Sequence, residues 1–162
     1  MTTTSTSTAP TSVIRHRDEA PATWFLNGLM TSLAATEETA GAYSITEHLV
    51  TSACTPPVHV QVDEDEAFYV VEGRMELEVD GRVVVAGPGT FALVARGSAH
   101  TFRPLTDTVR MLVICSGKPT DNLEEFFLAM GDPATERVLP VPSAPDLDRL
   151  GPLAARAGIE FV

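Results

Sequence analysis

Short apolar segments separated by tight turns follow one another from Tyr43 to Cys115. Met75–Val79 alternates apolar residues with glutamates, as a strand with one buried face does. Asp80-Gly81 then gives a strong hairpin signal, because both residues tolerate a positive φ. Many short strands joined by Gly, Pro and Asp turns indicate a mainly β protein built as a barrel or jelly roll. We expect these strands at residues 43–51, 58–62, 66–71, 75–79, 82–86, 90–94, 99–103 and 109–115.

Helical signals begin only after this run of strands. Asp121 or Asn122 can cap a helix over Leu123–Met130, and Gly131 stops it. A second helix is expected after Asp146, followed by an apolar C-terminal end that docks on the fold. With 162 residues, the chain is long enough for one domain with a real core. We predict a disordered tail at 1–12, a barrel at 13–117 and a helical extension packed on it at 118–162.

The charge and composition restrict the partners of the protein. A net charge of −11 argues against nucleic-acid and anionic-membrane partners, because both need a basic footprint. The chain has no apolar run of membrane-spanning length, and its Thr/Ser-rich beginning does not resemble a secretory signal. Cys54 and Cys115 stand singly inside apolar runs, which favours buried thiols in a cytoplasmic protein. We therefore expect a cytoplasmic protein whose partner is a small molecule.

Four polar residues on the expected strands form a candidate metal site. His59 and Gln61 are two residues apart in an extended run, so their side chains share one face. Glu66 begins the next strand, and His100 lies on a later strand that a barrel can bring alongside. Two imidazoles and one carboxylate are the ligand set of a facial triad for a divalent transition metal. Gln61 is interpreted either as a weaker amide ligand or as a hydrogen-bonding partner of a bound ligand.

These residues also fit two sequence motifs, G-x5-H-x-H-x3,4-E-x6-G and G-x5-P-x-G-x2-H-x3-N. Gln61 stands where the first motif has its second histidine, and Ala95 and Pro104 replace the proline and asparagine of the second. From about Tyr43 to Cys115 the chain resembles a small single-domain cupin of the quercetin-dioxygenase-like type. The residues that carry this resemblance are His59, Gln61, Glu66, Gly73, Gly89, Ala95, Gly97, His100 and Pro104.

The resemblance implies a double-stranded β-helix and a bound Fe, Ni, Mn, Co or Zn ion. It implies a dioxygenase acting on a flavonol-like, polyphenolic or enolic substrate, with Glu66 as the residue that takes the substrate proton, and a homodimer. Two alternatives stay open: a non-redox cyclase, isomerase or dehydratase of polyketide-type metabolism, and a non-catalytic binder. The site can also lack metal, with His59 and His100 as acid and base.

An apolar pocket beside this site is expected to suit an aromatic or polyketide-like substrate. The remaining histidines, His16 and His48, carry no motif and are interpreted as surface or incidental residues. Asp63, Glu64 and Asp65 are interpreted as solvent-facing acids of a turn. The residues predicted to line the pocket are Phe68, Met75, Phe91, Phe102 and Met111.

Overall fold

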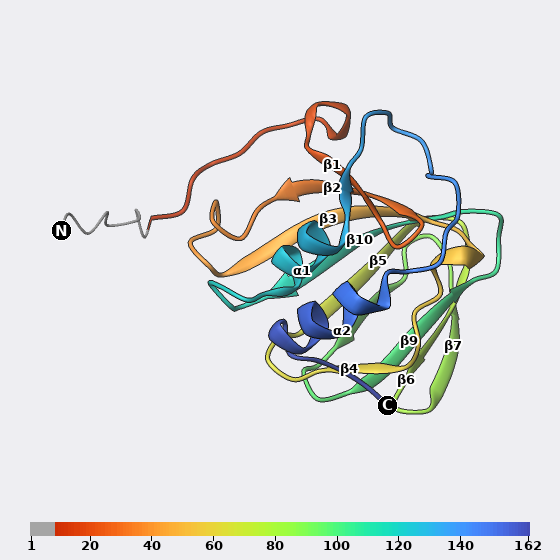
Figure 1. Ribbon diagram of the computed structural model, residues 1–162. Helices are drawn as coiled ribbons and strands as arrows, with labels where there is room; N and C mark the ends of the chain where they lie inside the picture. The colour runs from red at the N-terminus through yellow and green to blue at the C-terminus, as the bar shows by residue number, and fades with distance from the viewer. Residues whose placement is uncertain (1–8) are drawn as a thin grey trace.

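The computed structural model describes residues 9–162 (Figure 1). Within the predicted tail, residues 9–12 are exposed and have no regular structure, and residues 1–8 lie outside the described residues. The rest of the chain folds into two antiparallel sheets and two α-helices. The predicted mainly β jelly roll with C-terminal helices is therefore confirmed.

The larger sheet has seven strands in the order β11-β1-β2-β3-β10-β5-β8. Strand β10 lies inside this sheet and pairs with β3 on one side and β5 on the other. The strands of the larger sheet are β1 (Ala22–Phe25), β2 (Gly28–Ala34), β3 (Tyr43–Val50), β5 (Glu66–Glu72), β8 (Phe91–Val94), β10 (Val109–Ser116) and β11 (Asp132–Pro133).

The smaller sheet has five strands in the order β12-β4-β9-β6-β7. Asp80 and Gly81 both have positive φ at the turn between β6 and β7, which confirms the predicted hairpin. Two short 3-10 helices, η1 (Arg17–Glu19) and η2 (Ser52–Cys54), lie in connecting segments. The strands of this sheet are β4 (His59–Gln61), β6 (Met75–Val79), β7 (Arg82–Ala86), β9 (Ala99–Pro104) and β12 (Ile159–Phe161).

The core lies between the inner faces of the two sheets. The continuous apolar run of Val109–Cys115 predicts a strand buried on both faces, but the burial of β10 alternates. Its inward side chains are fully buried, whereas Arg110, Leu112 and Ile114 are half-buried on the outer face. The buried inward residues of β10 are Val109, Met111, Val113 and Cys115.

The C-terminal segment is joined to the barrel by both helices and strands. Asn122 caps α1 (Leu123–Met130) by accepting a hydrogen bond from the Glu125 N–H. Glu124 fixes the same helix, because its buried carboxylate accepts bonds from Thr36 N–H and the Thr36 and Ser32 hydroxyls. Figure 1 shows α1 beside α2 (Leu147–Arg156), above the strands of the smaller sheet. The apolar C-terminal end docks as β12, which pairs with β4.

Neither helix in the described part of the chain is long and apolar enough to cross a membrane.

Candidate metal centre

The two candidate histidine ligands are direct neighbours across two strands. His59 on β4 pairs with His100 on β9, and the centroids of their rings are 4.2 Å apart. The His100 side chain is almost completely enclosed, with 1% of its surface exposed. The antiparallel register of the smaller sheet thus brings together residues that are 41 positions apart in the sequence.

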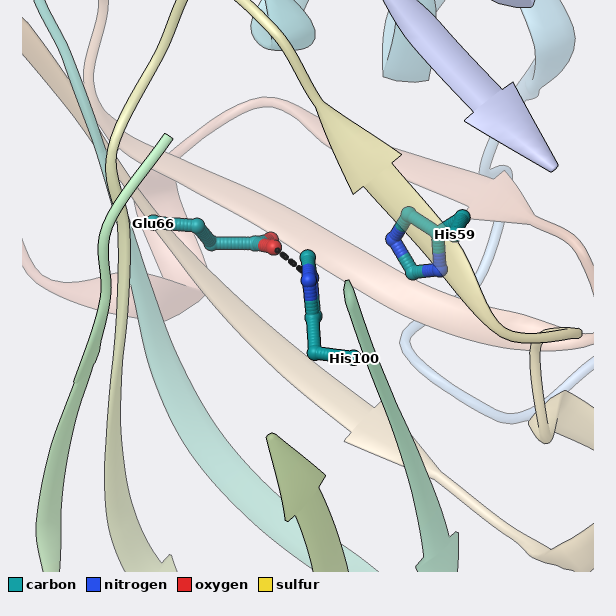
Figure 2. Close-up of side chains that lie close together, drawn as sticks. All are labelled: His59, Glu66 and His100. Atoms are coloured by element: carbon teal, nitrogen blue, oxygen red, sulfur yellow. Dashed lines mark hydrogen bonds and ion pairs between the residues drawn. The ribbon is translucent and has the colours of Figure 1, made fainter. Parts of the chain in front are cut away.

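Glu66 reaches the histidine pair from the other sheet, at the start of β5. Its Oε2 accepts a hydrogen bond of 3.0 Å from His100 Nε2. Figure 2 shows the carboxylate pointing at the His100 ring, with the His59 ring beyond it. The three side chains offer ligand atoms that all lie within 4.8 Å of one another. The sequence-predicted triad is therefore brought together at one point between the two sheets.

Gln61 lies beside this triad and is buried. Its Nε2 donates a 2.7 Å hydrogen bond to Glu66 Oε2, which fixes the orientation of the amide because a reversed amide would place two acceptors face to face. Its Oε1 is the one buried side-chain polar atom among the described residues without a hydrogen-bond partner. An enclosed acceptor without a partner is costly, so this oxygen indicates a missing donor or cation at the centre.

Both histidines use Nδ1 for a backbone hydrogen bond, so Nε2 faces the centre in each. His100 Nε2 bonds Glu66 Oε2 there, and an ion would take the place of that bond. Nδ1 of His59 lies 3.0 Å from the Pro57 carbonyl, and Nδ1 of His100 lies 3.1 Å from the Ser98 carbonyl. Since a carbonyl only accepts, each Nδ1 carries the proton and donates it. Backbone bonds of this kind orient metal-binding imidazoles and direct Nε2 to the ion. The hydrogen bonds from Nδ1 to the Pro57 and Ser98 carbonyls therefore suit a metal site.

Charge interactions couple Glu66 to His100. Burial opposes ionisation of Glu66, but the hydrogen bond and positive charge of His100 outweigh it and hold the pKa of the carboxyl below its usual range. Burial also opposes protonation of His100, yet its bond to Glu66 raises the pKa of the imidazole. Burial and the neighbouring His100 lower the pKa of His59. The centre thus contains a carboxylate and a neutral imidazole, both suited to bind a cation.

The donor set fits a transition metal better than Mg²⁺ or Ca²⁺. Two imidazole nitrogens, one carboxylate and one unpaired amide oxygen are ligands that Fe, Ni, Mn, Co or Zn accept, whereas Mg²⁺ and Ca²⁺ prefer oxygen ligands alone. The two Nδ1 bonds, which orient the imidazoles, are a separate observation that supports the same conclusion. The residues present therefore fit the metal that the sequence motifs imply.

A cavity of about 230 Å³ opens beside this centre. His59, Gln61 and Glu66 contribute to its wall, and the remaining lining is mainly apolar. Phe68, Phe102 and Met111 line it as predicted. Among the described residues that line it there is no lysine or arginine, so a carboxylate or phosphate ligand would find no counter-charge from a side chain.

Two of the residues predicted for the pocket lie elsewhere. Phe91 is on the outer face of edge strand β8 and is 59% exposed, because Ala92 and Val94 take the inward positions. Met75 is fully buried, but it is in the core at the start of β6, where it pairs with Ala86 and Pro104, and does not reach the cavity. Both faces of β8 are apolar, and its larger residues, Phe91 and Leu93, are the ones that point outward.

Two polar residues interpreted as surface groups are buried. His48 lies on the inward face of β3, lines the cavity and is 7% exposed. Glu64 is buried below α1 and accepts a hydrogen bond from the Leu123 N–H. Its burial raises the pKa of its carboxyl to about 7. The two-residue spacing of Ser44, Thr46 and His48 puts these residues on one face of the strand. The packing of Phe127 from α1 against His48 shows that this face is the inner one.

The comparisons with known proteins agree on this fold. Residues 46–116 match the protein family described as Cupin domain. Quercetin 2,3-dioxygenase from Bacillus subtilis (strain 168) is 31% identical over 94 residues, which cover 57% of this chain and 27% of that protein. The chain thus corresponds to about a quarter of that relative's length.

Two solved structures resemble the barrel. The polyketide cyclase RemF from Streptomyces resistomycificus matches with a TM-score of 0.55 and 27% identity, over 65% of this chain and 79% of that one. A predicted oxalate decarboxylase from Thermotoga maritima matches with a TM-score of 0.58 and 15% identity, over 65% and 99%. The second similarity bears on the fold alone. The relatives of higher identity are both enzymes by name.

Proposed function

We propose, from the match of residues 46–116 to the Cupin domain family and from the geometry of the site, that the protein is a metal-dependent enzyme that acts on a hydroxylated aromatic or enolic small molecule. The reaction we assign first is dioxygenation, as in the name of the Bacillus relative. The observation that carries the proposal is the position of His59, Glu66 and His100, which converge beside an apolar cavity with an unpartnered amide oxygen next to them.

The lining of the cavity supports this class of substrate. An apolar wall accommodates an aromatic or polyketide-like body, and a few polar groups fix its orientation. The absence of lysine and arginine from the described lining residues favours an uncharged molecule over a sugar acid or a phosphate ester. A phenol or enol meets these conditions, since it enters neutral and carries an oxygen that becomes an anion beside the metal centre.

Each residue of the centre has a distinct part in this scheme. His59 and His100 would hold the ion through Nε2, with Glu66 or Gln61 Oε1 completing the set. When bound, a divalent transition metal would act as a Lewis acid on the substrate oxygen, and a redox-active ion would also promote reaction with dioxygen. Glu66 Oε1 has no hydrogen-bond partner among residues 9–162 and is not fully enclosed. It is therefore the atom we assign to take the proton of the substrate hydroxyl.

A specific residue favours a second candidate, a non-redox cyclase, isomerase or dehydratase. Gln61 replaces an imidazole with a neutral amide, which donates less electron density to an ion and leaves Lewis-acid chemistry less affected than redox chemistry. The similarity to the polyketide cyclase covers 79% of that chain. Both candidates share the substrate class and the proton acceptor, and they differ in whether dioxygen is consumed.

Metal analysis and oxygen uptake test the proposal together. Protein purified without chelator is expected to carry close to one transition-metal ion per chain, and addition of quercetin is expected to consume dioxygen. His100→Ala should lose both, whereas His16→Ala, which changes an exposed histidine, should lose neither. Metal without oxygen uptake on any phenolic substrate would favour the cyclase. Binding without turnover would leave a small-molecule binder, and metal-free wild-type protein would refute the proposal.

A further inference from the structure

His48 is a second polar group of the cavity, outside the metal centre. It lies on β3, where its neighbours across the strands are Met30 and Met111. The rings of Phe25 and Phe127 pack edge-on against the imidazole, with centroids 6.4 Å and 5.3 Å away. The imidazole is therefore held in one orientation by packing from β1 and α1.

Hydrogen bonding to Thr46 occupies one nitrogen of this imidazole. His48 Nε2 lies 2.9 Å from the Thr46 hydroxyl oxygen, and the Val113 carbonyl oxygen lies 3.4 Å from the same hydroxyl. The Thr46 hydroxyl can accept from Nε2–H or donate to an unprotonated Nε2. In both cases Nε2 is occupied by Thr46, and Nδ1 is the nitrogen left for another partner, as acceptor or as donor.

The free nitrogen opens on the cavity. Nδ1 has no hydrogen-bond partner in the described part of the chain. Gln61 Oε1 is the one fully buried polar side-chain atom there without a partner, so Nδ1 is not fully buried. Nδ1 therefore keeps accessible surface, and the surface available to this inward side chain is the cavity that it lines. Burial lowers the pKa of His48 to about 4, so the ring is neutral at physiological pH.

His48 is thus a polar group of a mainly apolar cavity and is separate from the three residues of the metal centre. We propose that His48 Nδ1 forms a hydrogen bond with a second hydroxyl of the ligand, other than the one at the metal centre. The ligand class is then a flat, fused-ring or linked-ring aromatic molecule with two hydroxyls. This inference rests on the proposed function, because it takes the first hydroxyl to lie at the metal centre.

Two naphthols test this assignment by calorimetric titration of the metal-loaded protein. 2,6-Dihydroxynaphthalene has hydroxyls at both ends, and 2-naphthol has one. The wild-type protein should bind the diol about tenfold more tightly than 2-naphthol. One neutral hydrogen bond contributes about fivefold, and the choice of either hydroxyl of the diol for the metal contributes a further factor of about two. Equal affinity after the twofold allowance would overturn the inference, and so would failure of the diol to bind.

Two isosteric variants separate ligand binding from structural support. His48→Asn keeps a hydrogen-bonding group near the position of Nδ1 and loses the bond to Thr46, and His48→Gln does the reverse. We expect His48→Asn to keep most of the preference for the diol and His48→Gln to fall to about twofold. If His48 serves only to support the fold, both variants will keep the wild-type preference, and that result contradicts the inference. Thermal unfolding of both variants verifies that they are folded.

Failure of this inference is distinguishable from failure of the proposed function. Metal content depends on His59, Glu66 and His100, so both His48 variants should retain the wild-type metal content. His100→Ala should lose metal and bind both naphthols weakly and equally. A wild-type protein that holds metal, consumes dioxygen with quercetin and shows no diol preference would refute the role of His48 and leave the proposed function standing.

Discussion

Gln61 connects the two parts of the metal centre. Its Nε2 donates to the carboxylate of Glu66, while its Oε1 has no partner. One side chain thus orients a ligand from the opposite sheet and offers an oxygen of its own. The sequence alone left both roles open, because spacing places Gln61 on the face of His59 but does not fix the rotation of an amide. The hydrogen bond to Glu66 supports a combined role.

Substitution of Gln61 should change metal affinity in opposite directions. Gln61→Leu removes both the bond to Glu66 and the free oxygen, and we expect a loss of about tenfold or more, as found for outer contacts of metal ligands. Gln61→His adds a stronger donor, and we expect a gain of about tenfold. Competition for Zn(II) with a chelating dye measures both values. Wild-type affinity in the Leu variant would show that Gln61 does not contact the ion.

The burial of His48 predicts an acid-sensitive fold. Burial lowers the pKa of the folded protein's imidazole from 6.5 to about 4, so between these values the unfolded chain binds the proton and the folded chain does not. The stabilisation is therefore complete above pH 6.5 and is lost as the pH falls toward 4. The difference between these two pKa values corresponds to roughly 3 kcal/mol of the free energy of unfolding.

Urea denaturation at pH 7.5, 5.5 and 4.5 measures this effect. The carboxylates also titrate in this range, so the informative quantity is the difference between the wild-type protein and His48→Gln. Wild-type protein should lose roughly 2.5 kcal/mol more than the variant over this interval, since the loss is complete only below pH 4. Parallel pH profiles for the two proteins would show that His48 does not remain neutral in the folded state.

At the scale of strands and turns, local signals predicted more of the fold than long-range ones. The hairpin between β6 and β7 was predictable because Asp80-Gly81 and the alternation of β6 are adjacent in sequence. The docking of the C-terminal end was expected, but its pairing as β12 with β4 was not. A three-residue strand has too few residues to show a period, and its partner lies about a hundred positions away.

Gly73 illustrates a turn whose residue is determined by a distant segment. It has a φ of +81°, and a Cβ at this position would lie 2.3 Å from the Thr108 carbonyl oxygen. Gly81 has a similar φ of +78°, but a Cβ there would meet nothing within 4 Å. The two glycines therefore differ in crowding and share the same backbone strain.

This pair gives a matched test. Gly81→Ala should cost about 1–2 kcal/mol of the free energy of unfolding, from the left-handed backbone alone. Gly73→Ala should cost about 3 kcal/mol or more, because the backbone near Thr108 must also move. Urea denaturation of both variants measures the difference. Equal costs would mean that the loop around Thr108 yields without resistance.

For the molecule as a whole, the sequence predicted which ligand candidates come together better than it predicted the cavity. His59, Glu66 and His100 are related by a register that follows from strand order in a barrel. The cavity wall depends on which face of each strand α1 and α2 cover, and this is a property of packing between distant segments. For this reason the sequence alone assigns Phe91 to the pocket, although it is exposed, and leaves His48 as a surface or incidental residue, although it is buried.

The metal centre joins the two sheets, and this position predicts a large effect of metal on stability. His59 and His100 belong to the smaller sheet and Glu66 to the larger one. An ion held by all three would bind the folded chain and have no equivalent site in the unfolded chain. At a free metal concentration of a hundred times Kd, the stabilisation is about 2.7 kcal/mol.

Thermal unfolding should therefore respond to metal removal. For a chain of this size, about 2.7 kcal/mol corresponds to a rise in Tm of roughly 5–10 °C, which a chelator should reverse and excess Zn(II) should restore. His100→Ala should unfold at one temperature with or without metal, because the remaining pair of ligands holds the ion too weakly. His16→Ala should respond as the wild-type protein does. An equal rise in Tm for His100→Ala would place the ion elsewhere, since the bridge between the sheets requires the His100 imidazole.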